Sequence, residues 1–165
     1  MPLFNHLTFK LYDLVLWHIT ETEKELQDGI VLHPSDRNKL STCKNPVRKA
    51  EFLALRQCLK TYFGYNPEVF YHDTGKPYLM QDFNISFSHT RKFACMIISK
   101  SLQVGVDLEV FRENVQKIQP KFVRKEEAQM VQEQPIEHLT AYWSAKEVIV
   151  KILGDRKLDF KKEIR

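Results

Sequence analysis

The heptapeptide Val104-Gly105-Val106-Asp107-Leu108-Glu109-Val110 alternates apolar residues with glycine or carboxylate residues. A period of two places the four apolar side chains on one face of a β-strand and both carboxylates on the other. The pattern therefore predicts a strand over 104–110 that packs on a core. Two carboxylates on one face repel each other unless a cation lies between them, and an oxygen-only pair suits Mg²⁺. The alternative is an edge strand with an ordinary solvated polar face.

The composition of the chain is typical of a soluble globular protein, with 165 residues, 43% of them hydrophobic and 28% charged. The formal net charge of +4 is too small to indicate nucleic-acid binding, but it favours an acidic partner. Cys43, Cys58 and Cys95 have no metal-binding spacing, and we expect reduced thiols in a cytoplasmic protein. Neither a signal peptide nor a membrane-spanning run is indicated.

Local patterns predict an α+β protein. Pro46 and Gly64 bound a predicted helix whose solvent face carries Arg48, Lys49 and Arg56, and Gly154 ends a second long helix. The other expected helices cover 20–27, 124–132 and 136–153; the expected strands cover 7–19, 68–72, 83–87, 93–99 and 158–164. The segment 33–44 is predicted to be a loop or a broken helix, and 93–99 an inner strand because it is apolar on both faces. We expect two halves, 1–102 and 103–165, the second carrying the carboxylates.

Three further polar motifs accompany the heptapeptide. In Trp143-Ser144-Ala145-Lys146-Glu147, continued to Lys151, the spacing places Trp143, Glu147 and Lys151 on one face of a helix. Ser88-His89 offers donors to phosphate oxygens at a strand end, and Gly75-Lys76-Pro77 is a stiff turn with a mobile cation. Each motif alone has an ordinary alternative: a surface ion pair, a polar turn that caps a strand, and a surface turn.

In this order and spacing, the four motifs resemble the 4′-phosphopantetheinyl transferase superfamily. The similarity covers roughly residues 46–162 and is greater to the larger, surfactin-synthetase-type enzymes, which are pseudo-dimers of two similar α+β halves. Relatives usually continue with more strands after a segment like 158–165, so the C-terminal half is expected to be either truncated or smaller.

The resemblance implies holo-[acyl-carrier-protein] synthase activity, in which 4′-phosphopantetheine passes from coenzyme A to a serine of an apo carrier protein and 3′,5′-ADP is released. It implies Mg²⁺ ligands at Asp107, Glu109 and Glu147, with Asp107, Glu147 and Lys151 as catalytic residues. Whether Glu147 is the base or only a metal ligand stays open. The implied coenzyme A contacts are Arg48 with Arg37 or Lys39, Lys76, Pro77, Ser88, His89, Lys146 and Lys151.

The implied partner is an acidic acyl or peptidyl carrier protein of fatty-acid, polyketide or nonribosomal peptide biosynthesis, with no nucleic acid or membrane involved, and the protein is expected to be a monomer. Two alternatives keep the same residues. One is an Mg²⁺-dependent hydrolase of coenzyme A or nucleotide pyrophosphates, and the other is an inactive relative that only binds carrier proteins.

Overall fold

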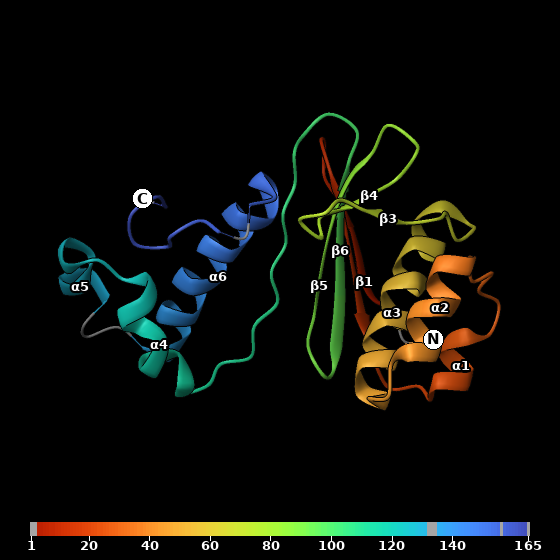
Figure 1. Cartoon of the computed structure of the whole chain (residues 1–165), viewed down its shortest axis with the longest axis horizontal. Coiled ribbons are helices and arrows are strands. Elements are labelled where there is room, and N and C mark those ends of the chain that lie inside the picture. Colours follow the sequence, from red (N-terminus) through yellow and green to blue (C-terminus); the bar gives the residue numbers. More distant parts are fainter. Residues whose placement is uncertain (1–2, 132–134, 156, 165) are drawn as a thin grey trace. The chain divides into compact units, whose positions relative to one another are not determined.

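The chain folds into two compact units, Met1–Leu108 and Glu109–Arg165 (Figure 1). The computed structural model describes residues 3–131, 135–155 and 157–164. The mixed helix and strand content agrees with the predicted α+β class.

Unit 1 is built on an antiparallel sheet in the order β1-β2-β6-β5. These strands are β1 (Leu3–Thr8), β2 (Asp13–His18), β5 (Asn84–His89) and β6 (Phe93–Ser99), and a separate pair consists of β3 (Phe70–Tyr71) and β4 (Pro77–Tyr78). The prediction of an inner strand at 93–99 is confirmed, since β6 pairs with β2 on one side and β5 on the other. The predicted strand at 68–72 is shorter than expected.

Three helices lie on one side of this sheet: α1 (Glu23–Gln27), α2 (Pro34–Thr42) and α3 (Pro46–Phe63) (Figure 1). Helix α3 has the predicted bounds, because Asn45 caps its first N–H groups and Gly64 ends it at φ 76°. Its middle residues, 51–59, are all buried and pack with β2, β5 and β6 in the core of the unit.

The segment 33–44 forms a regular helix, α2, where a loop or broken helix was predicted. Pro34 opens this helix, and Asp36 on its first turn lies inside the protein.

Both oxygens of Asp36 accept hydrogen bonds from Arg56, at 2.9 Å from Nε and 2.7 Å from Nη2. The expectation that Arg56 faces solvent is therefore wrong, because its side chain is fully buried against this partner. Burial alone would lower the pKa of Arg56, but the hydrogen bond to Asp36 and the charges of Tyr71 and Asp36 raise it overall.

The heptapeptide 104–110 is not a strand, and this prediction is wrong. Its first part is extended along β5 but bonds to side chains in place of a backbone ladder. The N–H groups of Val106 and Leu108 donate to the hydroxyls of Ser86 and Ser88, at 3.2 Å and 3.0 Å. The burial expected from the alternation holds for Val104 and fails for Val110, which is 46% exposed.

Unit 2 contains α4 (Asn114–Phe122), α5 (Lys125–Val131) and α6 (Ile136–Leu153), and no strand among its described residues. Helix α6 has the predicted bounds and ends at Gly154 with φ 71°. The strand predicted at 158–164 is wrong, because this segment forms turns in which Asp159 accepts the N–H groups of Lys161 and Lys162. The hydrophobic core of unit 2 consists of Val115, Phe122, Val123 and Leu139, with Trp143 and Phe160 packed beside them.

Candidate functional site

Ser88 links two of the sequence motifs in unit 1. This buried residue lies near the end of β5, and its hydroxyl donates to Oδ1 of Asp107 at 3.2 Å while it accepts the N–H of Leu108 at 3.0 Å. The end of β5 therefore orients the first carboxylate of the heptapeptide. Polar contacts of this kind suit a position that must hold a ligand in a fixed geometry.

Two predicted phosphate contacts, Arg48 and His89, meet at one carboxylate. Oε2 of Glu51 lies 3.0 Å from Nη1 of Arg48 and 3.1 Å from Nδ1 of His89. The Glu51 side chain is only 6% exposed, whereas Arg48 and His89 are 62% and 32% exposed. Sequence reasoning missed Glu51, although its place one helical turn after Arg48 is a readable signal for an ion pair.

Lys76 and Pro77 lie on the turn into β4. Gly75 has φ 82°, a conformation that glycine adopts without strain, and Pro77 is the first residue of β4. Nζ of Lys76 donates to Oε1 of Gln103 at 2.9 Å. The turn predicted from the composition is present, and its lysine is tied to the residue just before the heptapeptide.

Glu109 is held within unit 2 by the indole of Trp143. Nε1 of Trp143 donates to Oε1 of Glu109 at 3.1 Å. The indole ring stacks on Phe160 with centroids 5.1 Å apart and meets Phe122 edge-on at the same separation. Glu147 lies one helical turn further along α6 and is half-buried.

Lys146 lies in the interior of unit 2. Its Nζ donates to the carbonyl oxygens of Phe122, Phe160 and Ile164, at 2.8, 2.9 and 3.1 Å, and lies 3.4 Å from Oε2 of Glu127. An ammonium group has three N–H donors, and these acceptors can use all of them. These contacts favour an internal anchoring role for Lys146 over the phosphate contact expected from sequence. Lys151, five residues further along α6, is half-buried.

Tyr142 and Glu127 belong to the same network around Lys146. Burial raises the pKa of Tyr142, and its hydrogen bond to Glu127 raises it further, to about 12. For Glu127, burial alone would raise the pKa, but hydrogen bonds from Tyr142 and the Arg124 N–H and the charge of Lys146 lower it overall. The network links α5, which carries Glu127, to α6, which carries Tyr142 and Lys146.

The predicted site residues fall into two sets. In unit 1 the structure brings together Arg48, Ser88, His89 and Asp107, and in unit 2 it brings Glu109 close to α6, which carries Glu147 and Lys151. Across the described ranges, no group of three or more His, Cys, Asp or Glu side chains is gathered to hold a metal ion. The chemistry of the donors does fit Mg²⁺, since Asp107, Glu109 and Glu147 offer only carboxylate oxygens.

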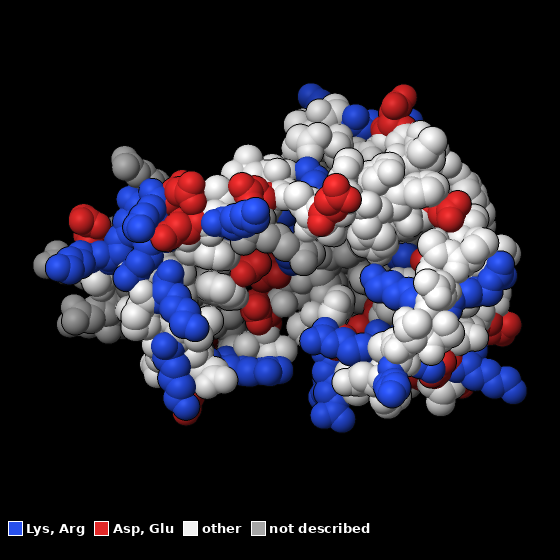
Figure 2. All heavy atoms as spheres, in the orientation of Figure 1, with Lys and Arg blue, Asp and Glu red and all other residues white. Residues whose placement is uncertain are grey.

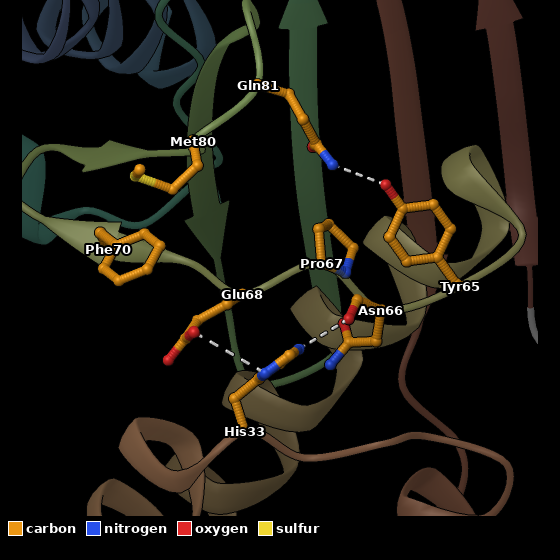
Figure 3. Close-up of a pocket in the computed structure, with 8 residues that line it drawn as sticks. All are labelled: His33, Tyr65, Asn66, Pro67, Glu68, Phe70, Met80 and Gln81. Atoms are coloured by element: carbon orange, nitrogen blue, oxygen red, sulfur yellow. Dashed lines mark hydrogen bonds and ion pairs between the residues drawn. The ribbon is translucent and has the colours of Figure 1, made fainter.

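Unit 1 also contains a pocket of about 240 Å³ next to β3 (Figure 3). Within it, His33 lies 2.9 Å from the carbonyl oxygen of Asn66 and 3.9 Å from Glu68, and Gln81 donates to the Tyr65 hydroxyl. No residue predicted from the sequence motifs lines this pocket.

Charged side chains of both signs are interspersed on the one face of the molecule that Figure 2 draws. On the face drawn in Figure 2, blue Lys and Arg side chains alternate with red Asp and Glu side chains over both units. In the part of the chain that the structure describes, no helix is long and apolar enough to cross a bilayer.

Comparison with known proteins agrees with the resemblance read from the motifs. The model of the 4′-phosphopantetheinyl transferase superfamily matches residues 103–163. The 4′-phosphopantetheinyl transferase AcpT of Salmonella typhi is 34% identical over 87% of this chain and 75% of its own length. AcpT of Salmonella typhimurium is 34% identical over 66% of this chain and 60% of its own length, and HetI of Nostoc sp. is 27% identical over 94% and 74%. The chain belongs to the 4′-phosphopantetheinyl transferase superfamily.

Proposed function

We propose that this protein transfers 4′-phosphopantetheine from coenzyme A to a serine hydroxyl of an apo acyl or peptidyl carrier protein and releases 3′,5′-ADP. The observation that carries the proposal is the contact between Ser88 and Asp107, which joins a phosphate-binding motif to a metal-binding motif. The relatives' names support the same reaction class. We further propose that the protein works as a monomer in the cytoplasm.

In this proposal Asp107, Glu109 and Glu147 hold Mg²⁺. When bound, the metal ion neutralises charge on the diphosphate of coenzyme A. The contacts with Ser88 and Trp143 support the assignment of the first two carboxylates, because each contact fixes a carboxylate before ligand binds.

The other proposed contacts bind the phosphates and the adenine of coenzyme A. Ser88 and His89 hold phosphate oxygens, and Lys76 and Pro77 border the adenine. Arg48, with Arg37 or Lys39, reaches the 3′-phosphate, because a doubly charged group needs cations nearby.

The chemical step is an attack of the carrier serine oxygen on the β-phosphorus. A new P–O ester bond forms, and the bond from this phosphorus to the bridging oxygen breaks, so that 3′,5′-ADP leaves with the electron pair. Lys151 stabilises the charge that grows on the leaving phosphate. Glu147 either accepts the serine proton or acts only through the metal.

The carrier protein is proposed to be acidic, since this chain has a net charge of +4. Charge attraction between the two proteins weakens as the Debye length falls from ~10 Å at 0.1 M salt to ~3 Å at 1 M. The KM for carrier protein should therefore rise with ionic strength, and a KM that stays flat would indicate apolar docking instead.

The decisive experiment is intact-mass spectrometry of an apo carrier protein incubated with this protein, coenzyme A and Mg²⁺. Transfer adds the mass of 4′-phosphopantetheine to the carrier. Release of phosphopantetheine without a carrier would identify a hydrolase, and carrier binding without any reaction would identify an inactive relative.

Two variants and one control locate the activity. Asp107→Ala should abolish transfer and leave the fold intact, and Glu147→Gln should lower kcat by on the order of 10²-fold or more if Glu147 is the base. Glu137→Gln is the matched control, because Glu137 is an exposed carboxylate on the first turn of the same helix. Near-normal turnover of Asp107→Ala would remove the metal assignment.

A further inference from the structure

Glu51 is a buried carboxylate that no sequence motif assigned to the site. One oxygen, Oε2, faces both the guanidinium of Arg48 and the imidazole of His89. Arg48 lies on the same helix, whereas His89 is the last residue of β5. The carboxylate thus connects two elements of unit 1 at the point where both carry a proposed phosphate contact.

Burial of Glu51 makes its contacts with Arg48 and His89 energetically important. A carboxylate with a 6% exposed side chain has lost most of its water, and it needs partners to offset that cost. It also attracts the Arg48 guanidinium, and the His89 imidazole when that ring is protonated, more strongly than an exposed carboxylate would, because less solvent screens the charges. Arg48, which is 62% exposed, is otherwise a long side chain with many rotamers.

The contact also determines the orientation of the imidazole ring. Nδ1 of His89 faces Glu51 and is shielded from solvent, so Nε2, on the opposite edge of the ring, points away from the carboxylate. At 3.1 Å, Nδ1 of His89 and Oε2 of Glu51 form an ion pair when the imidazole is protonated. Glu51 therefore limits the direction of the His89 ring.

We propose that Glu51 is a positioning residue for coenzyme A, which holds Arg48 and His89 in place for two different phosphates. This inference rests on the proposed function, because only that function assigns phosphates to these side chains. Glu51 itself has the same sign of charge as a phosphate and acts through its two partners. Its removal should weaken ground-state binding of coenzyme A and leave the chemical step largely intact.

The test compares Glu51→Gln, Glu51→Asp and Glu23→Gln in the full chain. Glu23, on α1, pairs with Lys49 of α3 at 3.3 Å, so Glu23→Gln controls for the loss of a carboxylate that forms an ion pair with α3. Glu51→Gln should raise the KM and the calorimetric Kd for coenzyme A by about tenfold, the effect of losing one charged contact, with kcat changed far less. Glu51→Asp should recover part of the affinity, and Glu23→Gln should match the parent protein.

A double-mutant cycle separates positioning from a general loss of structure. If Glu51 acts through His89, then His89→Asn and Glu51→Gln together should cost less than the sum of the two single changes. Additive effects would overturn the inference, and so would tighter coenzyme A binding in Glu51→Gln, which would mean that the carboxylate competes with phosphate. If Glu51→Gln fails to fold, Glu51→Asp takes its place in the cycle with His89→Asn, and additive effects there overturn the inference in the same way.

The same experiments distinguish this inference from the proposed function. A parent protein that neither binds coenzyme A nor modifies a carrier protein contradicts the proposed function. A parent protein that does both, with a Glu51→Gln variant of equal affinity, contradicts only the role of Glu51.

Discussion

The indole N–H of Trp143 donates to the carboxylate of Glu109 across 3.1 Å, and both residues belong to unit 2. The other carboxylate of the heptapeptide, Asp107, accepts from Ser88 in unit 1. Two acidic residues that are neighbours in sequence are thus oriented by different partners from different units. Each contact can be removed separately, with a matched control for each.

Trp143→Phe removes the donor to Glu109 and keeps an aromatic ring against Phe160. We expect a rise in the Mg²⁺ concentration that gives half-maximal transfer and a fall in kcat/KM of about tenfold, with little loss of stability. Trp17→Phe is the control, since Trp17 makes the same 3.1 Å indole contact to Glu21 in unit 1. Equal Mg²⁺ dependence in both variants would mean that the Glu109 contact has no functional role.

Ser88→Ala removes the donor to Asp107 and the acceptor for the Leu108 N–H. We expect weaker coenzyme A binding and a loss of stability of about 1–2 kcal/mol, because the partly buried N–H of Leu108 loses its acceptor. Ser86→Ala is the natural comparison, because Ser86 also lies on β5 and its hydroxyl accepts the Val106 N–H at 3.2 Å. Denaturant unfolding should give similar losses for both variants, and only Ser88→Ala should change the Kd. A similar Kd change in Ser86→Ala would assign the effect to the segment and not to Asp107.

Lys146→Met tests whether this lysine anchors unit 2. Three carbonyl oxygens lose their donor, so we expect a loss of stability of about 3 kcal/mol. Lys151→Met is the comparison, because the proposed role of Lys151 is chemical. It should lower kcat and cost less than about 1 kcal/mol of stability. Thermal unfolding and steady-state kinetics of both variants give the answer. If Lys146→Met is stable and has a raised KM for coenzyme A, the result would support the phosphate contact that the sequence predicts for Lys146.

Tyr142 should titrate far above an ordinary tyrosine. Burial and the hydrogen bond to Glu127 raise its pKa from 10.0 to about 12, so its neutral form is favoured in the folded protein. Its contribution to stability is therefore complete below pH 10 and is lost as the pH rises through about 12. Ultraviolet titration of tyrosinate, with Tyr142→Phe to identify the transition, measures this pKa. Glu127→Gln should move it back toward 10.0 without reaching it, because burial remains. A titration curve unaffected by Glu127→Gln would contradict the hydrogen bond.

The helices α3 and α6 could be predicted from the sequence to the residue, because their signals are local. A proline in the first turn of α3, and a glycine at positive φ after the last turn of both helices, define helix ends within a few residues of chain. The inner strand β6 was predictable for a similar reason, since an apolar run on both faces needs cover on both sides. The order of the polar motifs was enough to indicate the family.

The environment of the polar residues was decided only by tertiary structure. Arg56 has the sequence pattern of a surface residue, but Asp36, which lies 20 residues away, makes its burial favourable. The segment 104–110 has a strand pattern, but serine hydroxyls of β5 satisfy its N–H groups in place of a ladder. Lys146 and Glu51 are buried for the same reason, because the partners that offset the loss of water come from other elements. Hydrophobic periodicity specifies which face of an element is buried, whereas the position of a charge depends on a partner that only the folded chain brings close.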